Sequence, residues 1–171
     1  MIARLISERS GAAAAEMALV FPLLIIIMLG TFELGNYFLS EHILVKGVRD
    51  GAVFASRRAP LTSYDCAGGG GTYPADALAE AKNLVRTGQV SGGTDRLPNW
   101  DDVATVFTIT PSCTSSAGGT TLSGMYSSNG GQVPVLTITA RVPYRSLFGT
   151  VGFNAINLTL GATEQTAAVG I

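Results

Sequence analysis

The chain is poor in charged residues and contains a single histidine. Asp, Glu, Lys and Arg make up 13% of its 171 residues, and the formal net charge is −1. Eleven basic residues spread along the chain do not form the dense basic surface that neutralises nucleic-acid phosphates, so we expect no nucleic-acid binding. With His42 alone, one chain cannot build a histidine relay or a multi-histidine metal site. We therefore expect no enzyme activity, no metal site and no cofactor.

Two further chemical patterns are incomplete. The glycine run at 68–71 is not followed by the Lys-Ser or Lys-Thr pair of a phosphate-binding loop. Asp95, Asp101 and Asp102 lack the ligand spacing of a calcium loop, and they indicate a solvated turn instead.

Cysteine is also scarce, with only Cys66 and Cys113 in the chain. Both lie in loop-like surroundings rich in Gly and Ser. A cysteine pair in an exported domain usually forms a disulfide, so we predict a bond between Cys66 and Cys113. The alternative is two unpaired thiols in a reducing compartment.

In contrast to its few charges, the chain has one long apolar run, Ser10 to Phe32. Its roughly 21 apolar residues reach about 30 Å as a helix, enough to span the hydrocarbon core of a bilayer. One carboxylate, Glu16, lies inside this run, where a charge costs up to about 3 kcal/mol, so we expect it to have a function. Alternatively, Glu16 lies among the lipid headgroups of a plain signal anchor. A removable signal fits poorly, because the four-alanine run precedes the apolar core rather than following it.

The residues flanking the run predict the topology. Arg4 and Arg9 precede it, whereas Glu33 and Glu41 follow it and the first later cation is Lys46. Positive residues favour the cytoplasmic side, so the N-terminus should stay inside and the C-terminal domain should be exported. Lys46 and its neighbouring Arg49 weaken this asymmetry.

The helix should continue beyond the apolar run, because 33–57 contains no proline. We predict one helix of about 45 residues, bent at Pro22. Its amphipathic second half should bury one face, while the opposite face stays polar. Gly47 and Gly51, one turn apart, would let a neighbouring layer approach, or they simply weaken the helix. The predicted buried face comprises Leu34, Phe38, Val45, Val48, Ala52 and Ala55, and the polar face comprises Asn36, Ser40, Arg49 and Ser56.

The C-terminal part reads as one short helix followed by strands. Residues 74–87 form an amphipathic pattern with Leu78, Ala81 and Val85 on one face, and Gly88 should end the helix. Alternating apolar residues predict strands at 103–110, 133–144 and 156–163. These elements predict an α+β fold, in which a long N-terminal helix packs on a small antiparallel sheet with one extra helix.

The beginning of the chain resembles known assembly proteins. A polar leader, Gly11, four alanines and Glu16 at the start of an apolar helix resemble the N-terminus of a type IV prepilin. The stretches GAAAAEMALVFPLLIIIMLGTFELGNYF and VRDGAVFASR are similar to TadE-like proteins, the minor pseudopilins of the tight-adherence (Tad/Flp) pilus system. Major pilins of that system favour Tyr after the glutamate. This chain has Met17 there, which favours a minor subunit.

The resemblance implies a processing site and a pairing role. A prepilin peptidase would cut after Gly11, which leaves Ala12 as the new N-terminus and Glu16 as the fifth mature residue. Glu16 would then neutralise the freed amine of a neighbouring subunit. The implied segments are a leader at 1–11, a transmembrane helix at 12–32, its amphipathic continuation at 33–58 and a periplasmic domain at 59–171.

The expected function is therefore that of a structural subunit of a Tad/Flp pilus, needed for pilus biogenesis and surface adhesion. Its expected partners are other pilin and pseudopilin subunits, the prepilin peptidase, the inner-membrane assembly platform and the lipid bilayer. The expected location is the bacterial inner membrane, with possible incorporation into the pilus. An uncleaved, membrane-anchored assembly factor of the same machinery and an unrelated anchored binding or enzymatic domain remain the alternatives.

Overall fold

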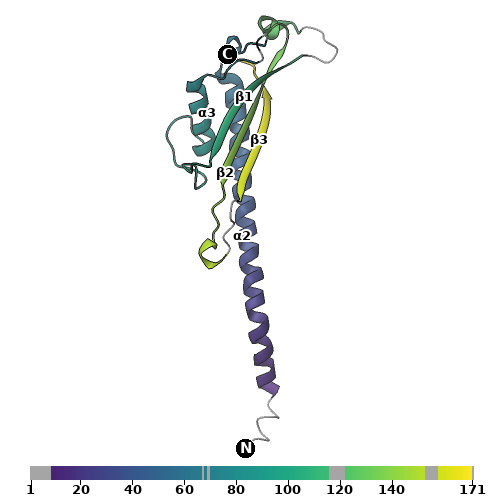
Figure 1. Ribbon diagram of the computed structural model, residues 1–171, viewed down its shortest axis with the longest axis vertical. Coiled ribbons are helices and arrows are strands. Elements are labelled where there is room, and N and C mark those ends of the chain that lie inside the picture. The colour runs from purple at the N-terminus through teal and green to yellow at the C-terminus, as the bar shows by residue number, and fades with distance from the viewer. Residues whose placement is uncertain (1–8, 67, 69, 116–121, 153–157, 171) are drawn as a thin grey trace, which may run out of the picture. The chain divides into compact units, whose positions relative to one another are not determined.

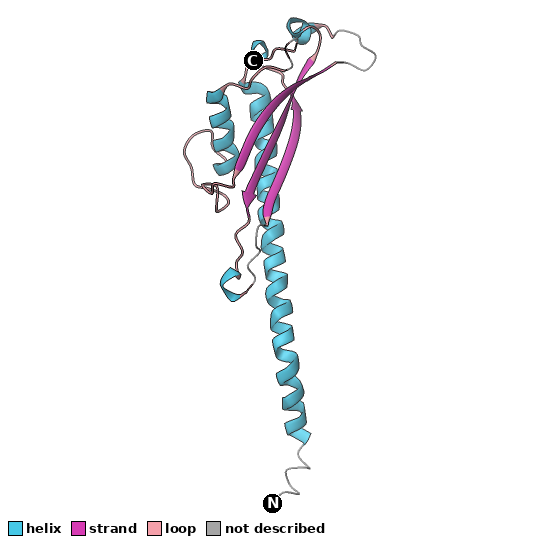
Figure 2. Ribbon diagram, viewed as in Figure 1, coloured by secondary structure: helices cyan, strands magenta, loops and turns pink. Residues whose placement is uncertain are grey.

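A computed structural model describes residues 9–66, 68, 70–115, 122–152 and 158–170. Most of the predicted leader and the first residues of the third predicted strand therefore lie outside the described residues. The predicted α+β class is confirmed (Figures 1 and 2). The elements are helices α2 (Arg9–Arg58) and α3 (Ala75–Thr87), strands β1 (Val106–Thr114), β2 (Val133–Pro143) and β3 (Thr159–Ala167), and the short 3₁₀ turns η1 (Leu61–Ser63), η2 (Gly124–Asn129) and η3 (Gly149–Val151).

The chain divides into two compact units. One contains α2 up to Phe38 together with the segment that begins at Ser146. The other runs from Leu39 to Arg145 and includes β3. The second unit contains α3, the sheet and the second half of α2.

The second half of α2 buries a face that is slightly rotated from the one the sequence predicts. Val48, Ala52 and Ala55 are buried as expected, but Leu34, Phe38 and Val45 are exposed. Leu44 is buried in place of Val45, and burial continues along the same face to Ala59. Small residues dominate this face, so neighbouring elements can approach the helix backbone closely.

Ser56 corrects the predicted polar face of α2, because it is buried rather than exposed. Its hydroxyl donates a hydrogen bond to the carbonyl oxygen of Val53 at 2.9 Å. Its own carbonyl accepts hydrogen bonds from the backbone amides of Val169 and Gly170 at 2.8 and 3.2 Å. The segment after β3 is thereby attached to α2. Ser56 can be buried because it is small and its hydroxyl is hydrogen-bonded within its own helix.

Gly47 and Gly51 mark the contact between α2 and α3. A Cβ at Gly47 would lie 2.8 Å from the carbonyl oxygen of Val85, and one at Gly51 would clash with the Val85 side chain. The prediction that a neighbouring layer approaches here is confirmed. Helix α3 ends at Gly88 as expected, in a left-handed conformation with φ 83°. Its buried residues are Ala77, Ala81 and Val85, with Ala77 in the place predicted for Leu78.

Strands β1, β2 and β3 form an antiparallel sheet in that order among the described residues. The central strand has the clearest alternation: Leu136, Ile138, Ala140 and Val142 are fully buried. Figures 1 and 2 show the sheet along the second half of α2. Alternation of this kind is expected when one face of an antiparallel sheet covers a helix and the other remains in contact with water. The outward face is rich in threonine, with Thr139 and Thr163 hydrogen-bonded across β2 and β3 at 3.2 Å.

The bounds of the outer strands differ from the prediction. Val103 is fully exposed in a turn, because the Asp102 carboxylate accepts a hydrogen bond from the Ala104 amide at 2.8 Å. Strand β1 starts later and continues through Pro111 to Thr114. A proline is tolerated there because β1 is an edge strand in the described sheet. Strand β3 runs on to Ala167, four residues past the predicted end.

A disulfide joins Cys66 and Cys113, the pair expected from the sequence. It connects the loop before α3 to the end of β1, opposite Pro134 of β2. Nearby, the Tyr73 hydroxyl donates to the Ala55 carbonyl oxygen of α2 at 3.1 Å. Covalent and polar links thus attach the loop between α2 and α3 to both the sheet and the helix.

Candidate assembly site on the N-terminal helix

The residues of the expected processing site lie together at the start of α2. Gly11, Ala12 and Glu16 are all helical and exposed. A Cβ at Gly11 would meet no atom within 4 Å outside its own helix turn, so no other element packs against this glycine. Ala12 and Glu16 are four residues apart, which places them on one face of the helix with a rise of about 6 Å between them. An amine at Ala12 and the Glu16 carboxylate would therefore face the same neighbour.

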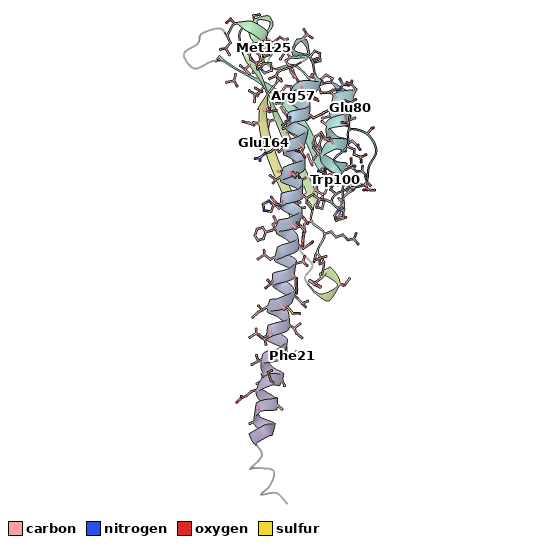
Figure 3. The ribbon with its side chains drawn as sticks, turned by 180° about the vertical axis from the view of Figure 1, so that it is seen from behind. Phe21, Arg57, Glu80, Trp100, Met125 and Glu164 are labelled. Atoms are coloured by element: carbon pink, nitrogen blue, oxygen red, sulfur yellow. A yellow bond between two sulfur atoms is a disulfide. The ribbon has the colours of Figure 1, made fainter. Side chains whose placement is uncertain are left out.

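The helix that follows is apolar and exposed on all sides. Figure 3 shows side chains around the whole circumference of this part of α2, with Phe21 labelled. Among the large apolar side chains of this stretch, Leu19 is the most exposed, at 81%. Among the described residues, α2 is the one helix long and apolar enough to cross a membrane, and its most apolar window is not buried at all. Such a surface requires lipid or other helices around it.

Pro22 lies inside α2, which remains helical on both sides of it. Proline removes one backbone hydrogen bond and clashes with the preceding turn, which is the reason to expect a kink. The kink at Pro22 stays a prediction.

Glu33 has a role that sequence reasoning did not reveal. Its carboxylate accepts hydrogen bonds from the Leu147 amide at 3.3 Å (Oε1) and 3.1 Å (Oε2). The Phe148 amide donates to Oε2 at 3.1 Å. The Glu-Leu-Gly motif at the helix exit singles out Glu33, but nothing local indicates a partner more than a hundred residues away.

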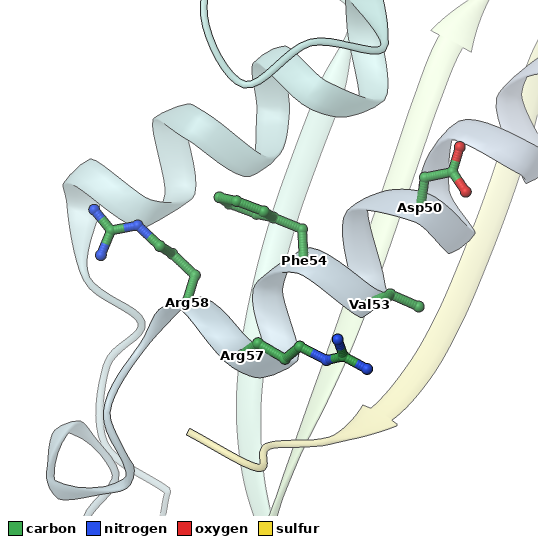
Figure 4. Close-up of a pocket in the computed structure, with 5 residues that line it drawn as sticks. All are labelled: Asp50, Val53, Phe54, Arg57 and Arg58. Atoms are coloured by element: carbon green, nitrogen blue, oxygen red, sulfur yellow. The ribbon is translucent and has the colours of Figure 1, made fainter. Parts of the chain in front are cut away.

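Figure 4 shows an open hollow on the outer side of α2, close to its C-terminus. Its lining residues are Asp50, Val53, Phe54, Arg57 and Arg58. The Arg58 guanidinium is already engaged, since its Nε donates to Glu80 at 2.6 Å and its Nη2 lies 3.4 Å from Asp76. The hydrogen bond and charge of Glu80 raise the pKa of Arg58. These five residues do not form an acid–base pair or an activated nucleophile.

The remaining candidates from the sequence are dispersed. His42 is exposed on α2. Asp95 and Asp101 pair with Arg86 instead of facing a common cavity. Across the described ranges, no group of three or more His, Cys, Asp or Glu side chains could hold a metal ion.

Comparison with known proteins finds a similarity in the helical segment. The family described as TadE-like protein matches residues 11–53. No curated protein and no solved structure matches the chain. The matched segment contains Gly11, Glu16, Pro22, Glu33, Gly47 and Gly51, and this family match suggests a protein associated with a Tad pilus.

Proposed function

We propose that this chain, which is TadE-like over residues 11–53, is a minor pseudopilin of a Tad/Flp-type pilus. It is a structural subunit without catalytic activity, and it serves pilus biogenesis and surface adhesion. Its helix spans the bacterial inner membrane with the N-terminus in the cytoplasm and the disulfide-bonded domain in the periplasm. It assembles with other pilin and pseudopilin subunits at the inner-membrane platform, and it can leave the bilayer as part of the pilus.

One observation carries this proposal. A single 50-residue helix combines an exposed apolar half, which contains the lone carboxylate Glu16, with a half that is built into a folded domain. A plain anchor needs neither a carboxylate at that depth nor a helix that continues into the domain. A subunit that packs side by side with others needs both, because the helix forms the shared core and the buried charge selects a partner.

A second candidate is an uncleaved, membrane-anchored assembly factor of the same machinery. The observation that favours it is the start of α2 at Arg9, before Gly11, which makes the Gly11–Ala12 bond helical. A peptidase requires local unwinding there. Because the first amides of a helix have no intrahelical partners, this turn is the easiest part of α2 to unwind.

The N-terminus of the mature protein distinguishes the two candidates. In a host with the matching prepilin peptidase, we expect Edman sequencing or intact mass to give a chain that starts at Ala12. Gly11→Leu should leave the precursor in the membrane, whereas Gly35→Leu, at an equally open helix glycine, should be processed normally. Wild-type protein that always begins at Met1 would rule out the pseudopilin and leave the anchored factor.

A further inference from the structure

The connection between β2 and β3 is attached to α2 at the end of the apolar run. Glu33 follows Phe32, the last residue of the predicted span. Its carboxylate accepts hydrogen bonds from the backbone amides of Leu147 and Phe148 at 3.1–3.3 Å. These amides therefore lie at the level where α2 would leave the bilayer. We call Ser146 to Gly149 the exit loop.

We propose that the exit loop lies in the membrane interface, with the Leu147 and Phe148 side chains in contact with lipid at the boundary between headgroups and acyl chains. The proposal rests on the membrane placement of α2 in the proposed function. It adds a second point of lipid contact, supplied by the connection between β2 and β3.

Exposure of the apolar side chains supports lipid as the partner. Leu147 is 58% exposed and Phe148 is partly exposed. On α2, Phe32 is 60% exposed and Leu34 is 54% exposed, on either side of Glu33. Acyl chains that cover Phe32 and Leu34 reach the same level as the exit loop, so one lipid environment covers all four side chains.

The hydrogen bonds of Glu33 also fit the interface. An unpaired backbone amide and an unpaired carboxylate are both costly where water is scarce. A charged acceptor that takes two backbone amides satisfies all three groups at once, and such bonds strengthen as the local dielectric constant falls.

A depth probe on the full-length protein tests the proposal. The protein is reconstituted without reductant into phosphatidylethanolamine–phosphatidylglycerol vesicles, and an environment-sensitive nitrobenzoxadiazole label is attached to Leu147→Cys. Leu24→Cys serves as the reference inside the span, and Met125→Cys, at an exposed side chain of the other unit, serves as the aqueous reference. Nitroxide-bearing lipids should quench the Leu147 label several-fold more than the Met125 label, and its emission should be shifted to the blue.

The outcomes separate this inference from the proposed function. If the Leu24 label is quenched but the Leu147 label behaves like the Met125 label, the exit-loop proposal is overturned. The membrane placement of α2 in the proposed function then still stands. If Leu24 is not quenched either, both fail. A Leu147 label shielded from aqueous iodide but not quenched by lipid identifies a protein neighbour, and it overturns the lipid assignment.

The role of Glu33 is tested with the same label. Glu33→Ala should abolish most of the lipid quenching at Leu147, because the exit loop loses its attachment to α2. Asp50→Ala, which removes an exposed carboxylate from the same helix, should leave the quenching unchanged. Equal quenching in both variants would overturn the claim that Glu33 positions the exit loop.

Discussion

Glu16 is a carboxylate in a stretch of helix, from Gly11 to Leu23, where every other residue is apolar or small. In water such a residue has no cost, because it is exposed. In a bilayer or a bundle of helices its charge must be neutralised by a partner. Under the proposed function, Glu16 therefore contributes to association with other subunits and not to the stability of the isolated chain.

Replacement of Glu16 by Gln should separate assembly from membrane insertion. We expect normal cleavage and normal membrane level, since an amide is easier to bury than a charge. Loss of one partner of a buried pair costs about 3 to 5 kcal/mol, which weakens association by two orders of magnitude or more. The measurement is co-purification with pilus partners from detergent extracts, with Asp50→Asn as the control. A complex of unchanged yield would contradict the pairing role.

Two buried tyrosines near the disulfide differ in one hydrogen bond. The Tyr73 hydroxyl donates to the Ala55 carbonyl, whereas the buried Tyr64 hydroxyl has no hydrogen-bond partner within the described residues. Burial raises the pKa of Tyr64 to about 12, and burial is also the main cause of the raised pKa of Tyr73. Each phenol is thus held in its neutral form in the folded domain.

Substitution by phenylalanine should therefore give opposite results at the two positions. Tyr73→Phe should lower the free energy of unfolding by about 1 kcal/mol, because the bond to α2 is lost. Tyr64→Phe should be neutral or slightly stabilising, because it removes an unsatisfied buried hydroxyl. Urea unfolding of the two variants provides the comparison. Equal losses at both positions would show that the Tyr73 bond contributes nothing.

The same tyrosines predict the response to alkaline pH. Their folded pKa values lie above the unfolded value of about 10, so the stability they provide is complete below pH 10 and is lost as the pH rises towards 12. Unfolding followed by tyrosinate absorbance between pH 9 and 12 should show this decline. Tyr64→Phe should reduce its slope, and a wild-type slope in that variant would refute the assignment.

At the scale of elements, the contact between α2 and α3 depends on the absence of a Cβ at Gly47 and Gly51. Gly47→Ala places a methyl group against the Val85 carbonyl, and a backbone atom cannot rotate away. Alanine is the better helix former by about 1 kcal/mol, but overpacking costs about 1 to 3 kcal/mol. We expect a net loss of domain stability in thermal unfolding. Gly35→Ala, where a Cβ meets nothing within 4 Å, should be neutral or stabilising. A stabilising effect at both glycines would show that α3 yields without cost.

Local patterns predicted the elements whose neighbours are close in sequence. The end of α3 at Gly88 and the bounds of β2 follow from turn chemistry and strict alternation. The start of β1 was misplaced, because the side-chain bond of Asp102 forms a turn that hydrophobicity does not reveal. The rotation of the α2 face from Val45 to Leu44 depends on where the sheet lies, which is a tertiary property. Ser56 was assigned to water by its polarity, although its hydroxyl bonds to its own helix.

The candidate site shows the same division. Gly11 and Glu16 were found because their spacing lies within one stretch of sequence. Glu33 accepts hydrogen bonds from exit-loop amides that lie 114 and 115 positions later in the chain. No periodicity in the sequence predicts these bonds. Long-range hydrogen bonds of this kind become visible only in the folded chain.

At the scale of the whole molecule, the disulfide between Cys66 and Cys113 constrains the domain that follows the apolar helix. It closes a loop of about 48 residues, which is worth about 4 kcal/mol in the chain-entropy model. Reduction, or the double change Cys66→Ser and Cys113→Ser, should lower the free energy of unfolding by about that amount. Urea unfolding with and without dithiothreitol measures it, and the double variant should not respond to the reductant. Freely alkylatable cysteines in protein isolated from cells would argue against an oxidising compartment.

The number of cysteines also determines what the folding chain requires from its surroundings. With two cysteines and one bond between them, oxidation within one chain has a single possible product. An oxidant is therefore sufficient, and no isomerase is needed to correct a wrong pairing. Moreover, the bond encloses α3 and most of β1 but neither β2 nor β3. With the topology of the proposed function, the bond can close as soon as Cys113 has crossed the membrane, so covalent closure can precede sheet formation.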